Sequence, residues 1–187
     1  MIIKSLKKSN AKGYLILGVE SEGETVFYTV SEAQYSLVGS LLIGDEIDGD
    51  TLNSLDSFSE YNKAKKKALS VLSFGDNSKR ELYSKLVRSG IKSDTAKGVT
   101  EEMVRLGYIN EARQLERLIE NEVNKRLTGP RKYTQKLAMK GYSPQEVRRI
   151  TESLVSRGII DFDETKKKLA EKFEGGELRK ILYKHGF

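Results

Sequence analysis

The feature that most constrains this chain is an internal repeat with a period of 51 residues. A gap-free shift by this distance brings glycines onto glycines and apolar residues onto apolar residues over a long stretch. A fixed period of this length is typical of stacked helical units, each of which buries its apolar face against the next. The matched pairs are Lys85 with Lys136, Leu86 with Leu137, Gly90 with Gly141, Val99 with Ile150, Met103 with Leu154, Gly107 with Gly158, Ile109 with Ile160 and Asn110 with Asp161.

The repeated positions carry the signals that begin and end helices. An oxygen-bearing side chain is followed three residues later by a carboxylate, which is the pattern of a capping box. Pro144 stands at a first helical position, where proline is tolerated. Glycine at a helix end supplies the left-handed backbone that stops the helix. The expected caps are Ser78 with Glu81, Ser143 with Glu146 and Asp161 with Glu164, and the expected stops are Gly90, Gly107, Gly141 and Gly158.

Apolar residues at spacings of three and four place three helices in each repeat. The first repeat, residues 61–110, should contain helices over 62–74, 78–89 and 93–106. The second, residues 111–161, should contain helices over 111–127, 130–140 and 144–157. A third, shorter repeat over 162–187 should contain helices over 162–173 and 177–184, with Gly186 and Phe187 echoing Gly141 and Tyr142. The predicted fold is therefore mainly α, with tandem three-helix repeats.

Residues 1–60, which we call the head, have a different pattern. Runs rich in β-branched and aromatic residues over 2–7, 14–20 and 25–30 alternate with turn-like segments, which predicts a small antiparallel sheet. A short helix over 31–38 should begin at Ser31 and bury Leu37 and Val38, and residues 51–55 should add another turn. We expect the boundary between head and repeats near Glu60.

The charge differs between these two parts. The head contains 4 Lys/Arg and 10 Asp/Glu, whereas residues 61–187 contain 29 Lys/Arg and 17 Asp/Glu. A basic body favours contact with phosphates or with an acidic protein surface, and such contacts weaken as salt rises. The alternative is that these side chains only solvate the outer helix faces.

Most catalytic chemistry has no support in this sequence. There is no cysteine, and the single histidine, His185, lies at the C-terminus, where we expect a frayed surface position. The glycines of 39–44 have phosphate-loop spacing, but Asp45 and Glu46 follow them. The acidic residues of 45–50 do not match a calcium loop. We therefore expect no enzyme, cofactor or metal site, and because no long apolar run or secretion signal is present, a cytosolic protein outside membranes.

Basic residues at helix starts and outer faces are the best candidates for binding. Lys132, Lys136 and Lys140 recur at four-residue spacing, so they should share one helix face. Tyr133 and Tyr142 have the chemistry to stack on a nucleic-acid base, although its apolar spacing favours a core position for Tyr133. The candidate contact residues, called the basic set below, are Lys79, Arg80, Lys85, Arg88, Lys125, Arg126, Arg131, Lys132, Lys136, Lys140, Arg148 and Arg149.

The ordered segments 68–73, 78–86, 106–111, 129–131, 135–137 and 140–141 resemble the motifs of the RecX family, whose members modulate the bacterial recombinase RecA. The resemblance covers residues 68–141, and the repeat extends it to about 155. The order and spacing of the motifs are more specific than any one of them. Asn110 stands where the family usually has Asp, and Gln114 where Phe is common.

This resemblance implies an elongated, curved array of three-helix repeats that lies along the groove of a RecA filament and inhibits the recombinase, with consequences for DNA repair, recombination and the SOS response. The partners it implies are the RecA filament and single- or double-stranded DNA. The leading alternative is a helical DNA-binding protein that acts without RecA. A small hydrolase would need a nucleophile paired with a base, and the sequence offers none. We expect a monomer in which the head caps the first repeat.

Overall fold

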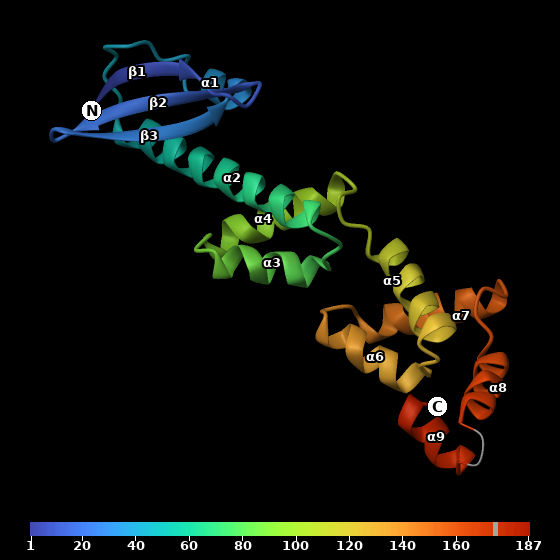
Figure 1. Ribbon diagram of the computed structural model, residues 1–187. Helices are drawn as coiled ribbons and strands as arrows, with labels where there is room; N and C mark the ends of the chain where they lie inside the picture. The colour runs from blue at the N-terminus through green and yellow to red at the C-terminus, as the bar shows by residue number, and fades with distance from the viewer. Residues whose placement is uncertain (174–175) are drawn as a thin grey trace. The chain divides into compact units, whose positions relative to one another are not determined.

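The computed structural model describes residues 1–173 and 176–187. Its contacts divide the chain into two units: Met1–Phe74 with Lys85–Thr100, and Gly75–Ser84 with Glu101–Phe187. The chain is mainly helical and begins with a three-stranded antiparallel sheet (Figure 1). The expected fold class is confirmed.

The sheet of the first unit consists of β1 (Ile2–Lys8), β2 (Tyr14–Ser21) and β3 (Glu24–Ser31), with β2 in the centre. These strands fall where the runs of β-branched and aromatic residues predicted them. Successive side chains of a strand point to opposite faces, so one face of the sheet carries the apolar residues. The head core consists of Ile3, Leu17, Val19, Tyr28, Val30, Ile47 and Leu55.

Two helices of the head differ in part from expectation. The helix α1 (Glu32–Leu37) begins, as predicted, at Ser31, whose hydroxyl accepts from the amide of Gln34 at 3.2 Å. Its buried side was predicted wrongly for Leu37, which is 77% exposed, whereas Val38 does pack against the core. The expected turn at 51–55 is the start of a long helix, α2 (Gly49–Ser73), because Asp48 caps it by accepting from the amide of Thr51 at 2.8 Å.

The helix α2 runs through residue 60 without a break and packs along β3 (Figure 1). Asn62, which is buried, donates to the carbonyl of Thr29 at 3.0 Å and to Gln34 Oε1 at 2.7 Å. The hydroxyl of Ser59 accepts from the Thr29 amide at 3.1 Å. A buried amide group must find partners to offset its desolvation, and here it ties α2 to both β3 and α1.

Glu60 of α2 binds Lys92 and Thr95, which also belong to the first unit. The chain continues through α3 (Lys79–Arg88) and α4 (Ser93–Arg105), and α3 ends at Gly90 in the left-handed conformation, with φ of 86°. The carboxylate of Glu60 accepts from the Lys92 amide at 3.3 Å and pairs with the Lys92 ammonium at 2.7 Å. The hydrogen bonds from Lys92, followed by that from Thr95, lower the pKa of Glu60.

The second unit is built on α5 (Glu111–Glu120), a π-helical turn η1 (Asn121–Lys125), α6 (Pro130–Met139) and α7 (Pro144–Ser156). The helix expected over 111–127 is thus α5 extended by η1. The helix α7 packs against both α5 and α6 (Figure 1). Within each helix the core residues recur at spacings of three and four. The core consists of Leu115, Ile119, Val123, Tyr133, Leu137, Tyr142, Val147, Ile150, Leu154 and Ile160.

The third repeat contributes α8 (Phe162–Lys172) and α9 (Leu178–His185). Our expectation of a frayed His185 was wrong. Its ring Nδ1 lies 3.0 Å from the carbonyl oxygen of Leu127, and its own carbonyl accepts from the Gly129 amide at 2.8 Å. Gly186 is left-handed and its carbonyl accepts from the Arg131 amide at 3.2 Å, so the end of α9 is held against the start of α6.

The three predicted caps have different outcomes. Ser78 and Glu81 form both bonds of a capping box, each at 3.1 Å. Asp161 caps α8, although Glu164 pairs with Lys168 instead of completing the box. The prediction for Ser143 was wrong, because its side chain makes no cap bond and Glu146 pairs with Arg149. The four predicted glycine stops all have positive φ.

Candidate interaction surface

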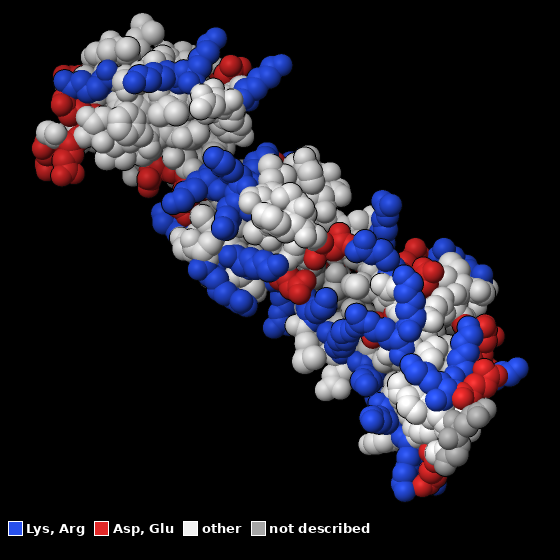
Figure 2. Space-filling model, in the orientation of Figure 1, with Lys and Arg blue, Asp and Glu red and all other residues white. Residues whose placement is uncertain are grey.

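Lys and Arg side chains cover much of the visible surface of α5 to α9 (Figure 2). Eleven of the twelve residues of the basic set are exposed, and Lys136 is partly buried. Their helices present them outward because the opposite, apolar stripe is buried in the core. The members differ, however, in whether their charged groups form ion pairs or hydrogen bonds within the protein.

Two of the three lysines at four-residue spacing, Lys132 and Lys136, lie in α6 and have partners within the protein. The Lys132 ammonium donates to the carbonyl of Lys184 at 3.4 Å, and Lys136 pairs with Glu122. Lys140 follows the last residue of α6 and its side chain is exposed. Lys132 and Lys136 thus lie four residues apart on α6, and their ammonium groups contact α9 and η1.

Glu122 organises the basic residues around η1. Its side chain is 9% exposed and accepts from Arg126 at 2.9 Å as well as from Lys136. A buried carboxylate is stable only when paired, so two of the basic set serve to neutralise it. Sequence analysis did not identify Glu122, because its burial depends on the packing of η1 against the rest of the second unit.

Arg131 also contacts another residue of the second unit, Tyr183. Its guanidinium lies 4.1 Å from the centroid of the Tyr183 ring and donates to the Tyr183 carbonyl at 2.5 Å. A cation over an aromatic face adds electrostatic attraction to the hydrogen bond. Arg131 therefore helps to hold α9 while keeping one side of its guanidinium in solvent.

The remaining members lie at helix ends and outer faces. Lys79 and Arg80 form the first turn of α3, and Lys85 and Arg88 lie in its last turns. The side chains of Lys125 and Arg148 are exposed, at η1 and α7 respectively. Arg149 pairs with Glu146 at 2.8 Å, and the hydrogen bonds that its guanidinium donates to that carboxylate raise the pKa of Arg149.

The two tyrosines considered for base stacking are buried. Tyr133 is fully buried, as its spacing predicted, and its hydroxyl lies 3.0 Å from Thr151 Oγ1. Tyr142 is 4% exposed and donates to Gln114 Oε1 at 2.8 Å, so its ring has no free face for a base. Burial, followed by nearby carboxylates such as Glu81, raises the pKa of Tyr142 to about 12.

The structure adds two hollows that sequence analysis did not identify. A polar cleft of about 350 Å³ at the start of α5 is lined by Arg113, Arg117, Tyr108 and Asp76. A second hollow of about 580 Å³ lies within the first unit, where Lys63 and Lys66 of α2 flank the sheet residues Tyr14, Ile16 and Thr29. Their residues are distant in sequence, so only the runs of basic residues could have indicated them.

Residues 1–173 and 176–187 offer no group of three or more His, Cys, Asp or Glu side chains placed to hold a metal ion. Over the same residues, no helix combines the length and the apolar character that a membrane span requires.

Comparison with known proteins relates this architecture to one family. No family model matches the chain. A curated protein of Streptococcus uberis (strain ATCC BAA-854 / 0140J), "Regulatory protein RecX", is 24% identical over 158 residues, which are 84% of this chain and 57% of that protein. The chain thus spans little more than half the length of this relative. A solved structure described as "Crystal structure of regulatory protein RecX" aligns with all of this chain and 94% of its own, at a TM-score of 0.76 and 19% identity.

The chain is similar to a RecX protein in sequence and shares the fold of RecX structures. A second RecX structure, from Lactobacillus salivarius, covers 68% of this chain and 88% of its own with a TM-score of 0.58 and 20% identity. The resemblance indicated by the ordered motifs is confirmed by the sequence match and the shared fold together.

Both departures from the usual RecX pattern have a structural role. Asn110 caps α5 by accepting from the Arg113 amide at 3.0 Å, which a side-chain amide oxygen does as well as a carboxylate. Gln114 is buried and satisfies the hydroxyl of Tyr142. Gln114 thus supplies a hydrogen-bond acceptor at the position where Phe is common in the RecX family.

Proposed function

We propose that this chain regulates the bacterial recombinase RecA in the cytoplasm by binding the RecA–DNA filament and inhibiting it, and that it does so as a monomer without chemistry of its own. The observation that carries this proposal is the RecX motif order on a fold that matches RecX structures along the whole chain. Inhibition of the recombinase then affects DNA repair, recombination and the SOS response.

The distribution of charge supports binding to an anionic filament. Residues 61–187 carry 29 Lys/Arg against 17 Asp/Glu, and most of the basic set is exposed. A nucleoprotein filament presents phosphates together with acidic protein surface. Many weak contacts distributed along repeats add up to a specific interaction with such a partner.

Within the basic set, we propose that the exposed residues Lys125, Lys140 and Arg148 carry the intermolecular contacts. Lys132, Lys136, Arg126 and Arg149 have internal partners and contribute less. An ion pair inside the protein already lowers the energy of the cation, so its contact with phosphate gains less.

The test is the single-stranded-DNA-dependent ATPase of RecA, titrated with this protein at two salt concentrations, alongside direct binding to the same DNA. We expect suppression at protein concentrations that leave free DNA mostly unbound. Untouched ATPase and filaments at equimolar protein would refute the proposal. If suppression only follows coverage of the DNA, the protein is a DNA-binding protein that acts without RecA, which the basic surface also favours.

A charge-reversal variant tests the contact residues. Lys125→Glu, Lys140→Glu and Arg148→Glu together should weaken filament binding at least about tenfold and reduce its salt dependence. The matched control reverses Lys7, Lys8 and Lys12, which are exposed on the head and change the net charge equally. Equal loss in both variants would show that only net charge matters and would remove these three residues as contact sites.

A further inference from the structure

The hollow of the first unit, called the sheet hollow below, lies on the face of the sheet opposite the head core. Its volume is about 580 Å³, and its floor includes Tyr14 and Ile16 of β2 and Thr29 of β3. Successive side chains of a strand point to opposite faces, and Leu17 is buried in the head core, so Ile16 lies on the other face. The helices α1 and α2 contribute their apolar residues to the core on the Leu17 face.

Phe27 extends the apolar surface of this floor. The strand register pairs Ile16 with Thr29 and Gly18 with Phe27, and such cross-strand partners lie on the same face. A Cβ at Gly18 would lie 3.0 Å from the ring of Phe27, so this ring lies over the glycine. Phe27 is 62% exposed. The face therefore presents two aromatic rings, Tyr14 and Phe27, with Ile16 between them.

The helix α2 places lysines at the rim of the sheet hollow. It lies along the edge of β3, where Ser59 and Asn62 bind the backbone of Thr29. The following turn brings Lys63 and Lys66 to the hollow, and because they are three residues apart they share one helix face. Both are exposed, and neither is paired with a carboxylate among residues 1–173 and 176–187.

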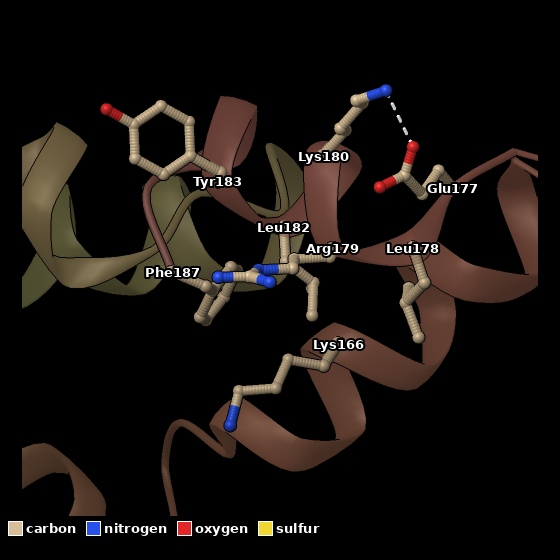
Figure 3. Close-up of a pocket in the computed structure, with 8 residues that line it drawn as sticks. All are labelled: Lys166, Glu177, Leu178, Arg179, Lys180, Leu182, Tyr183 and Phe187. Atoms are coloured by element: carbon tan, nitrogen blue, oxygen red, sulfur yellow. Dashed lines mark ion pairs between the residues drawn. The ribbon is translucent and has the colours of Figure 1, made fainter.

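The balance of charge distinguishes the sheet hollow from the other hollows described. Three of its lining residues are lysines, and its described lining contains no acidic side chain. In the hollow between α8 and α9, by contrast, Lys180 pairs with Glu177 at 2.7 Å (Figure 3). In the cleft at the start of α5, Arg117 pairs with Asp76. The lysines of the sheet hollow are therefore placed to attract an anionic ligand from solution.

Lysines above aromatic rings fit the two chemical parts of an unpaired nucleotide. The phosphate is attracted by the ammonium groups, and the base stacks on a ring. A duplex keeps its bases stacked inside, so it offers no base face to Tyr14 or Phe27. An acidic peptide would satisfy the lysines but would leave the two rings without a planar partner. The combination favours a single strand.

We propose that the sheet hollow binds single-stranded nucleic acid, with phosphates at Lys63 and Lys66, one base on Tyr14 and a further base on Phe27. The site lies outside the basic set, goes beyond the proposed action on RecA and does not depend on it. The lysines reversed in the control variant above, Lys7, Lys8 and Lys12, do not line the hollow, so that control leaves its lining unchanged.

The first test locates the bound bases. An oligothymidylate in which iodouracil replaces some bases is crosslinked to the full chain by ultraviolet light, and the adducts are mapped by peptide mass spectrometry. We expect adducts at Tyr14 or Phe27. Tyr14→Ala should weaken binding of the fluorescent oligonucleotide at least about fivefold, because a stacked base is lost, whereas Tyr14→Phe should retain it. Circular dichroism and urea unfolding establish whether each variant keeps the fold, and Phe27→Ala, at a mainly exposed position, provides a second variant.

The second test concerns the phosphate contacts. Lys63→Gln with Lys66→Gln removes two cations, so the slope of log K against log salt should become shallower by about 1.4, at about 0.7 per phosphate contact on a single strand. The matched control is Lys67→Gln with Lys97→Gln, which changes the net charge equally at exposed positions of the same unit that do not line the hollow. This control should leave the slope and the adducts unchanged.

Several outcomes would overturn the proposal. One is the absence of adducts at both Tyr14 and Phe27, and another is an equal change of slope in the two lysine variants. Competition by a duplex as strong as that by the single strand would exclude stacking. Equally strong competition by oligoglutamate would make an acidic protein segment the ligand. Suppression of the RecA ATPase is measured separately with each variant, and its loss or retention bears on the proposed function alone.

Discussion

Replacing Ser78 by Ala tests how the start of α3 is stabilised. The Ser78 hydroxyl accepts from the Glu81 amide at 3.1 Å and donates to the carbonyl of Lys140 at 2.6 Å, and the residue is fully buried. Loss of a serine cap costs about 0.5–2 kcal/mol. Loss of the second bond, which leaves a buried carbonyl without this donor, costs about 1 kcal/mol more. The second unit should therefore lose about 1.5–3 kcal/mol of stability.

The measurement is urea unfolding followed by circular dichroism, with hydrogen exchange at the Glu81 amide as a local probe. With a urea dependence of about 2 kcal/mol per molar, the midpoint should fall by roughly 1 M. Ser143→Ala is the matched control, because it has the same sequence signature but an exposed side chain without a cap bond, and it should change stability by less than about 0.5 kcal/mol. Equal effects of the two changes would refute this reasoning.

Three further predictions concern the second unit. Glu122→Gln removes the buried carboxylate that pairs with Lys136 and should cost about 1–3 kcal/mol in urea unfolding, while DNA binding is retained because Lys136 is released; weaker DNA binding would contradict this. The raised pKa of Tyr142, about 12 in the fold, means that the native state keeps a proton which the unfolded state loses above its pKa near 10. Stability should therefore be unaffected below pH 10 and fall between pH 10 and 12 by up to about 1 kcal/mol per pH unit, and Tyr142→Phe should lose this slope in alkaline unfolding. A Cβ at Gly129 would lie 2.5 Å from the carbonyl oxygen of Gly186, so Gly129→Ala should undock α9 and speed its proteolysis at unchanged head stability; unchanged cleavage would count against it.

Much of the fold could be predicted because its local signals agree with its packing. The three strands and the helices from α3 to α9 begin and end close to the expected residues, since each is bounded by caps, glycines or turn residues and has an apolar period of its own. The early part of α2 was predicted only as a turn at 51–55, although Leu52, Leu55 and Phe58 recur at a spacing of three and pack in the head core. Its helical state depends on Asp48 and on packing against β3.

Less of the candidate surface could be predicted from the sequence. Spacing predicted one shared face for Lys132, Lys136 and Lys140, but it could not show that Glu122 and the carbonyl of Lys184 would bind two of these lysines. Ion pairs between residues far apart in the chain depend on which helices and strands pack against one another. For the same reason, the sequence could not show that Gln114 accepts a hydrogen bond from the hydroxyl of Tyr142.

The sequence by itself determined the repeat, the element order, the separation of an acidic head from a basic body, and the RecX resemblance, because these follow from periodicity, composition and the chemistry of helix ends. Only the tertiary structure decided which of the similar serines caps a helix and which cations remain exposed. Those outcomes depend on contacts between segments distant in the chain, and the same local pattern permits more than one of them.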